Sequence, residues 1–192
     1  HKLVVHFGFI NRSKDIEALF HAHDGLLRAG QPVRLLMLGD PLGASDPSNR
    51  AFLEEVHARA AELKLAEPWL QWTGDLSEDE IIKGLLAADL VVLPYRDGAS
   101  LRRTTLITPL ALGRPVLTTE PTTPIPFFED GHNIALARRE NGAELARRMA
   151  LLLRYEPTLQ RLERGAQALA PQFNWEGVVQ QHLNVYTTLR RQ

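Results

Sequence analysis

The sequence predicts an α/β domain with a doubly wound, Rossmann-like parallel sheet of about six strands, followed by a helical C-terminal tail. Three observations lead to this class. Short and almost entirely apolar runs, such as LLML and LVVL, are typical of strands buried on both faces, as in a parallel sheet. These runs alternate with segments whose apolar residues recur at helical spacing. After the last run only helical patterns follow, so we expect one domain over residues 1–192.

Six segments are predicted to be strands, because each is short and rich in apolar residues. They are Leu3–Gly8, Val33–Gly39, Leu70–Gly74, Leu90–Pro94, Pro115–Thr119 and Asn133–Ala137. Three of them end in glycine, which lets a ligand or a second backbone approach closely. In a doubly wound sheet, ligands bind outside the carboxyl ends of the strands. The loops that follow these strands are therefore the places to search for a site.

Helical patterns fill the intervals between the strands and the tail. They predict helices over Asp15–Ala29, Asn49–Leu65, Ser77–Ala88, Ala143–Leu153, Pro157–Leu169 and Trp175–Leu189, and one that begins after Ser100. Ser77 and Glu80 have the spacing of a capping box. Pro109 lies inside the helix that begins after Ser100, where it removes a backbone hydrogen bond. We therefore expect that helix to bend or end near Pro109.

The composition excludes several classes of protein. Hydrophobic residues make up 44% of the chain, enough for a sizeable core, and a formal net charge of -1 argues against nucleic-acid binding. The absence of cysteine removes disulfides, thiolate metal sites and cysteine nucleophiles, and fits a cytoplasmic protein. No apolar run approaches the ~20 residues that cross a bilayer, so we expect no direct membrane insertion. The histidines are scattered and no acidic pair follows a strand, so we expect neither a metal nor a cofactor.

Paired cations occur in two loops where a helix is predicted to begin. Arg12 and Lys14 follow the first strand, and Arg102 and Arg103 fall in the first turn of a helix that has Ser100 as its N-cap. Cations at this end of a helix oppose the helix dipole. A bound anion offsets that cost, and both a helix N-terminus and arginine suit phosphate. The sequence therefore predicts a phosphate site formed by the first and fourth strand loops, which meet at one edge of such a sheet.

In the order and spacing of its motifs, the chain resembles the C-terminal domain of the retaining GT-B glycosyltransferases of group 1 (family 4). The resemblance covers essentially the whole chain, although no single motif is decisive. It is carried by Gly8, Ile10 and Lys14, by Gly39-Asp40, by Gly74, Leu76 and Ser77, by Ala88, Asp89, Leu90 and Pro94, by Gly113, Pro115 and Val116, by Asp130, Gly131 and Asn133, and by Phe173 and Trp175.

The resemblance implies one half of a GT-B fold that binds a nucleotide-diphosphate sugar without a metal ion. Its catalytic residues would be Lys14, Arg102 and Arg103, which stabilise the negative charge on the leaving phosphate. The remaining donor-binding residues would be Gly8, Arg12, Asp75, Leu76, Asp97, Gly98, Ser100, Leu101, Thr104 and Thr108. We expect the base and ribose near Asp75-Leu76 and Thr108.

The chain departs from the family pattern at several site positions. Phe9 stands where the family has a phosphate-binding arginine, and Arg12 is the nearest substitute. The family's E-x7-E signature is absent. Asp97 takes the place of its first glutamate, with about three extra residues after it, and Thr108 takes the place of the second. The residues SLRR replace a glycine-rich turn. These differences predict a variant site that binds the pyrophosphate through arginines.

The domain that binds the acceptor would be an N-terminal half outside this sequence, so we expect the chain alone to bind donor and transfer nothing. Three alternatives remain at this point. A GT-B-type sugar-nucleotide epimerase would have the same architecture. A degenerate nucleotide-binding or scaffolding domain would fit the missing glutamates. A receiver domain would need acidic pairs at strand ends and a lysine after the fifth strand, where Thr118-Thr119 stand instead.

Overall fold

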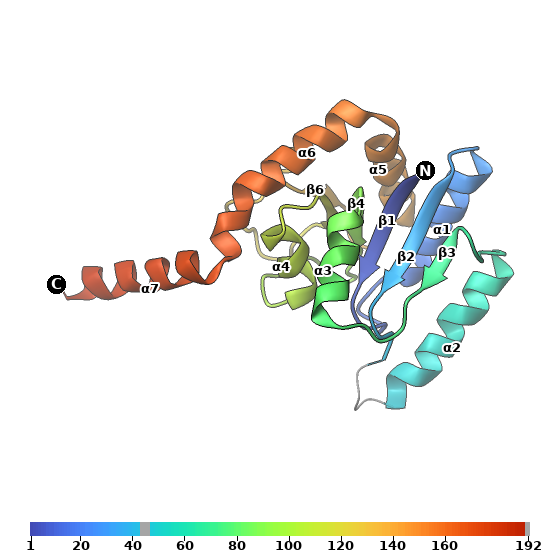
Figure 1. Ribbon diagram of the computed structural model, residues 1–192, viewed down its shortest axis with the longest axis horizontal. Helices are drawn as coiled ribbons and strands as arrows, with labels where there is room; N and C mark the ends of the chain where they lie inside the picture. The colour runs from blue at the N-terminus through green and yellow to red at the C-terminus, as the bar shows by residue number, and fades with distance from the viewer. Residues whose placement is uncertain (43–46, 191–192) are drawn as a thin grey trace.

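Six parallel strands form the centre of the computed structural model, which describes residues 1–42 and 47–190 (Figure 1). They are β1 (Lys2–Phe7), β2 (Val33–Leu38), β3 (Leu70–Trp72), β4 (Leu90–Leu93), β5 (Val116–Thr119) and β6 (Ala135–Ala137). Within the sheet their order is β3-β2-β1-β4-β5-β6, and every neighbouring pair is parallel. The predicted doubly wound, Rossmann-like fold is confirmed, and each predicted strand is present with slightly different bounds.

The helices begin and end close to the predicted positions, with one exception. They are α1 (Ile16–Arg28), α2 (Pro47–Glu62), α3 (Glu78–Ala87), α4 (Thr104–Ala111), α5 (Gly142–Arg154), α6 (Glu156–Leu169), the 3-10 helix η1 (Ala170–Phe173) and α7 (Trp175–Leu189). The predicted capping box of Ser77 and Glu80 begins α3, where each side chain binds the backbone N–H of the other residue. Trp175 begins α7, but its side chain is outside the part of the chain that the structure describes.

The exception is α4, where the sequence placed the helix start too early. Ser100 was the expected N-cap, but the N-cap is Arg103 and the helix begins at Thr104. The Ser100 hydroxyl instead accepts a hydrogen bond from the Arg102 N–H at 3.3 Å, and the Ser100 carbonyl accepts one from the Arg103 N–H at 3.1 Å. Ser100 therefore closes a turn ahead of the helix. Pro109 lies inside α4, which ends soon after it at Ala111.

Consecutive residues of the central strands face opposite helical layers, because side chains alternate along a strand. Val4 and Val92 pack in the apolar cluster that includes residues of α1, α2, α5 and α6. Val5 and Val91 pack in the cluster that includes residues of α3 and α4. This double burial explains why the central strands read as continuous apolar runs.

The strand order determines where a ligand can approach the sheet. The chain runs outward from β1 to β3 and then returns to place β4 on the other side of β1. The neighbouring strands β1 and β4 therefore lead into helices on opposite faces of the sheet. In sheets of this kind, ligands bind in the crevice between the two loops that follow such strands.

At the other end of the chain, α7 extends away from the body (Figure 1). Within residues 1–42 and 47–190, no helix has the length and apolar character to span a membrane.

Candidate functional site

Backbone contacts hold the loop after β1 against the loop after β4. Lys14 forms an isolated antiparallel bridge with Tyr95. On either side of it, the Arg96 N–H donates to the Ser13 carbonyl and the Asp15 N–H donates to the Pro94 carbonyl, both at 2.8 Å. Segments about 80 residues apart thus form one surface at the carboxyl edge of the sheet. This is the convergence of the two cationic loops that the sequence predicted.

Lys14 lies beneath this surface and is almost completely buried. Its residue is 3% exposed, and its Nζ donates a 3.4 Å hydrogen bond to the Phe7 carbonyl. No described carboxylate forms an ion pair with Lys14. Burial, and then the nearby Arg103 guanidinium, lower the pKa of Lys14 to about 7.

Gly8 allows β1 and α4 to approach each other at this point. Its φ of +103° is in the region that favours glycine. A Cβ atom at Gly8 would overlap the Cγ2 of Thr105 and lie 2.8 Å from the Nζ of Lys14. The absence of a side chain at Gly8 therefore leaves room for both the buried ammonium group and the first turn of α4.

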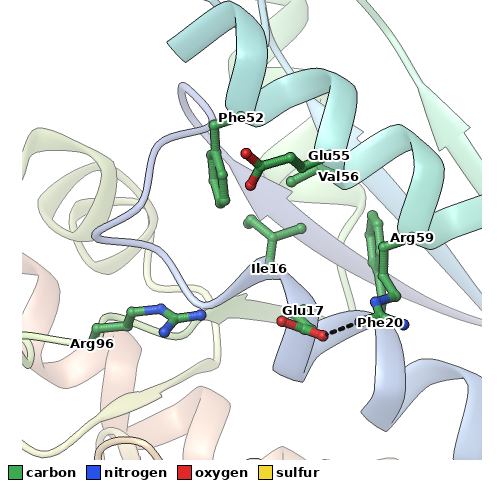
Figure 2. A pocket seen from close by; sticks show the side chains of 8 residues that line it. All are labelled: Ile16, Glu17, Phe20, Phe52, Glu55, Val56, Arg59 and Arg96. Atoms are coloured by element: carbon green, nitrogen blue, oxygen red, sulfur yellow. Dashed lines mark hydrogen bonds and ion pairs between the residues drawn. The ribbon is translucent and has the colours of Figure 1, made fainter. Parts of the chain in front are cut away.

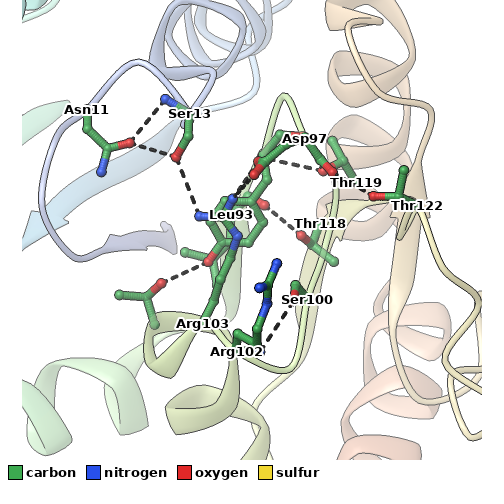
Figure 3. A network of polar contacts seen from close by, with 12 residues as sticks. Asn11, Ser13, Leu93, Asp97, Ser100, Arg102, Arg103, Thr118, Thr119 and Thr122 are labelled. Carbon is green, nitrogen blue, oxygen red and sulfur yellow. Dashed lines mark hydrogen bonds and ion pairs between the residues drawn. The ribbon is translucent and has the colours of Figure 1, made fainter.

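Arg103 is the second cation of the cluster, and four side chains define its surroundings (Figure 3). Its Nη2 binds both carboxylate oxygens of Asp97, and its Nη1 donates to the Ser13 hydroxyl at 3.4 Å. The Ser13 hydroxyl in turn donates to Asn11 Oδ1 at 2.7 Å. The guanidinium carbon lies 4.1 Å from the centre of the Tyr95 ring.

Arg102 is exposed and does not share these contacts. Its backbone N–H is bound to Ser100, but its guanidinium has no hydrogen-bond or ion-pair partner among the described residues. Leu101 and Thr104 are also exposed in this turn. The structure thus brings Lys14 and Arg103 together and leaves Arg102 as a separate, solvated cation beside the start of α4.

Arg12, the expected substitute for a phosphate-binding arginine, is turned toward α2. Its guanidinium lies 2.8 Å from Glu55 Oε1 and 4.8 Å from the centre of the Phe52 ring, and its side chain is 71% exposed. Because α2 supplies both partners, Arg12 does not contact Lys14 or Arg103. A pattern of residues along one loop could not reveal a partner on another helix.

Four other expected site residues lie around the cluster without joining it. Thr108 donates its hydroxyl to the Thr104 carbonyl at 2.9 Å, one turn further along α4. Asp75 and Leu76 follow β3, which β2 separates from β1; Asp75 is exposed and Leu76 packs on the apolar cluster beneath α3. Gly98 follows Asp97, and a Cβ atom there would lie 3.2 Å from the Cδ of Arg139.

Tyr95, Ser13 and Thr105 are part of the cluster but were missed by the sequence reasoning. Tyr95 is the second residue after β4, in the same loop as Asp97 and Gly98, and this position at the end of a strand could have marked it as a site residue.

His6 also lies near the cluster. It is buried, its Nδ1 contacts the Val92 carbonyl at 2.9 Å, and its Nε2 has no partner among the described residues. Burial, and then the charge of Lys14, lower the pKa of His6 to about 3. His6 is therefore neutral and adds no charge to the cluster.

A separate cavity of about 170 Å³ lies between α1 and α2 (Figure 2). Its apolar wall and charged rim consist of Ile16, Phe20, Phe52, Val56, Glu17, Glu55, Arg59 and Arg96. An ion pair of 2.7 Å between Glu17 and Arg59 lies at the rim. Neither Lys14 nor Arg103 lines this cavity.

Within residues 1–42 and 47–190, no group of three or more histidine, aspartate and glutamate side chains is placed to hold a metal ion.

Comparison with known proteins relates the chain to sugar-transferring enzymes. Residues 1–155 match the family described as glycosyl transferases group 1. The chain is 28% identical, over 185 residues, to a D-inositol 3-phosphate glycosyltransferase of Streptomyces bingchenggensis (strain BCW-1). That match covers 96% of this chain but only 40% of the relative, so the chain spans less than half of the relative's length.

Solved structures share the fold at lower sequence identity. The structure of HepE from Anabaena in complex with UDP and glucose aligns with a TM-score of 0.78 and 21% identity, covering 97% of this chain and 48% of that one. The C-terminal domain of the glycosyl transferase group 1 family protein LpcC from Francisella tularensis aligns with a TM-score of 0.74 and 15% identity. In that case the match covers 89% of this chain and 85% of the other.

Proposed function

The chain belongs to the group 1 glycosyl transferases, and from this premise we propose that it is the donor-binding domain of a glycosyltransferase. In this proposal Lys14, Arg103 and the first turn of α4 bind the diphosphate of a nucleotide sugar. One observation carries it: a buried lysine and a partly buried arginine lie together at the carboxyl edge of β1 and β4, with Asp97 as the only ion-pair partner of either in the described chain. A diphosphate would supply the missing negative charge.

The start of α4 adds donors to these two cations. The N–H groups of the first turn of a helix have no acceptor within the helix and point toward its N-terminal end. Thr104 and Thr105 occupy that turn, and Arg103 is the N-cap. Backbone N–H groups and arginine together form a binding site for phosphate oxygens. The complex of HepE with UDP and glucose, a protein of similar fold, supports a nucleotide sugar as the ligand.

The same groups would assist transfer of the sugar. As the bond from the sugar to the diphosphate breaks, negative charge develops on the leaving phosphate. Cations that are already in place stabilise this charge without reorganisation, which is commonly a large part of catalysis. Lys14 and Arg103 would take this role in place of a metal ion. The base and ribose would lie toward Asp75, Leu76 and Thr108, and a second domain would bring the acceptor.

Calorimetric titration with UDP, in a buffer that contains a chelator, tests the proposal. We expect binding without added metal. Lys14→Met and Arg103→Ala should each weaken it by about tenfold or more, because a charge-assisted hydrogen bond contributes roughly 1.5–3 kcal/mol. Arg102→Ala should have a smaller effect, since its exposed guanidinium is free to reorient.

Arg28→Ala is the matched control, because it removes the same charge at the far end of α1, where Arg28 pairs with Asp24. It should leave the affinity for UDP unchanged. Binding of UDP that requires magnesium or manganese would contradict the proposed site. So would Lys14→Met and Arg103→Ala variants that bind UDP as tightly as the parent and the Arg28→Ala control. No binding at all would favour the scaffolding alternative.

A further inference from the structure

Tyr95 occupies the centre of the cationic cluster although nothing in the cluster's charge requires it. The residue is completely buried, immediately beyond β4. Its backbone N–H donates to the Thr119 hydroxyl at 3.1 Å, and its carbonyl accepts from the same hydroxyl at 2.6 Å. On the other side its backbone bridges to Lys14. The main chain of Tyr95 is therefore held from both β5 and the loop after β1.

The Tyr95 side chain connects Arg103 to α4. The Arg103 guanidinium lies over the ring, with its carbon 4.1 Å from the ring centre. The hydroxyl group lies 2.9 Å from Thr105 Oγ1, within the first turn of α4. Burial raises the pKa of Tyr95 to about 12, so this hydroxyl keeps its proton near neutral pH. The ring is thus oriented at both ends before any ligand binds.

An aromatic face holds a guanidinium in a way that an acid cannot. The five N–H donors of arginine bind acceptor oxygens, whereas the aromatic face attracts the guanidinium by its charge and requires none of those hydrogen bonds. The ring therefore leaves the donors available to phosphate oxygens. Asp97 and Ser13 instead accept hydrogen bonds from Nη2 and Nη1, so they compete with a phosphate for these donors. Asp97 is also 63% exposed, so solvent weakens its hold on Arg103, while the buried ring is not affected in this way.

We propose that Tyr95 is a positioning residue that presents the N–H donors of Arg103 to the diphosphate. In this role the ring keeps the guanidinium beside Lys14 despite their repulsion, and it continues to do so when the ligand displaces Asp97 and Ser13. Tyr95 does not itself contact the ligand. This inference rests on the proposed function, since it concerns the same diphosphate site.

The test compares two variants by calorimetric titration with UDP. Tyr95→Phe keeps the ring and removes the hydroxyl, so it should bind within about threefold of the parent. Tyr95→Leu removes the aromatic face and should bind roughly tenfold more weakly. Thermal melts establish that each variant is folded.

A double-mutant cycle separates positioning from general disruption of the structure. If Tyr95 acts through Arg103, Tyr95→Leu should weaken UDP binding by less than about twofold in an Arg103→Ala background. A second tenfold loss in that background would overturn the inference. Equal affinity of the parent and Tyr95→Leu would overturn it too, while leaving the proposed function intact. If the parent fails to bind UDP, the proposed function fails and the inference fails with it.

Nuclear magnetic resonance of arginine side chains provides a measurement that does not depend on the folding of Tyr95→Leu. A guanidinium stacked over a ring has Nε–H and Nη–H signals displaced by the ring current. We expect displaced signals in the parent and in Tyr95→Phe, assigned by their loss in Arg103→Ala. Undisplaced Arg103 signals in the folded parent would show that the ring does not hold the guanidinium, and would contradict the inference.

Discussion

At the residue scale, burial distinguishes cations that look equivalent in the sequence. Lys14 is 3% exposed, the Arg103 side chain is 20% exposed and the Arg12 side chain is 71% exposed. A buried ammonium group without an acid is costly, so it loses its proton more readily than a solvated one. This is the cause of the low pKa of Lys14, and it means that the charged form of Lys14 destabilises the folded protein.

The cost of this charge predicts how stability depends on pH. The pKa of Lys14 is about 7 in the folded protein, against an ordinary value of 10.5. Between these values the unfolded chain holds a proton that the folded protein lacks, so the free energy of unfolding rises with pH. The destabilisation is complete below pH 7 and disappears as the pH rises to 10.5. Lys14→Met should therefore stabilise the protein at pH 6, by about 2 kcal/mol or more, and have little effect at pH 10.

Chemical denaturation in phosphate-free buffer measures this difference. Lys2→Met is the control of opposite sign, because ion pairs with Asp89 and Glu156 raise the pKa of Lys2. Removing that lysine should slightly lower the free energy of unfolding. An effect of Lys14→Met that is the same at pH 6 and pH 10 would show that charge burial is not its cause.

At the element scale, the site depends on how closely β1 and α4 approach each other. Gly8 ends β1 where the first turn of α4 and the Lys14 ammonium lie against it. The true start of α4 at Thr104 also places Arg103 at the N-cap, where its side chain reaches back to Ser13 and Asp97. If the helix began after Ser100, as the sequence suggested, Arg103 would lie within its first turn.

Alanine substitutions at two glycines distinguish the cost of a positive φ from the cost of the steric overlap between β1 and α4. Gly8 and Gly39 both follow strands and have φ values of +103° and +95°. A Cβ atom at Gly39 would meet only the Phe7 ring at 4.0 Å, whereas one at Gly8 would overlap Thr105. Both alanine variants should lose roughly 1–2 kcal/mol from the positive φ, and Gly8→Ala should lose about 1–3 kcal/mol more from the overlap. Equal losses in urea denaturation would contradict the close approach.

At the scale of the whole molecule, α7 differs from the other helices because it extends away from the body (Figure 1). Val179, Leu183 and Tyr186 are each more than half exposed. By contrast, Leu162 and Ala166 of α6 are fully buried. Phe173 in η1 packs against Phe127, so the body of the domain is complete where η1 ends.

Truncation after Phe173 tests this division. Because α7 buries few apolar side chains, its removal should change the melting temperature by less than about 3 °C. Truncation after Arg154 is the contrasting variant, since it also removes α6 and exposes the core beneath it. That variant should unfold or melt at least about 10 °C lower. A similarly large fall in melting temperature on truncation after Phe173 would show that α7 belongs to the folded unit.

The sequence by itself determined the class of fold and the loops that form the candidate site. Alternating apolar runs and helical patterns predicted all six strands, because burial on two faces leaves a local signal that needs no knowledge of the partner. Cations in the first and fourth loops predicted that these loops meet at one edge of the sheet, and they do. The resemblance to group 1 glycosyl transferases was also visible in the order of short motifs along the chain, and it is confirmed.

Only the tertiary structure decided which of those residues lie together. Lys14 and Arg103 meet, while Glu55 of α2 holds Arg12 and solvent surrounds Arg102. The physical reason is that a side chain's burial and partner depend on elements that are distant in sequence. The charge of Lys14 and the aromatic support of Arg103 are set by contacts between β1, the loop after β4 and α4, and no local pattern along the chain records those contacts.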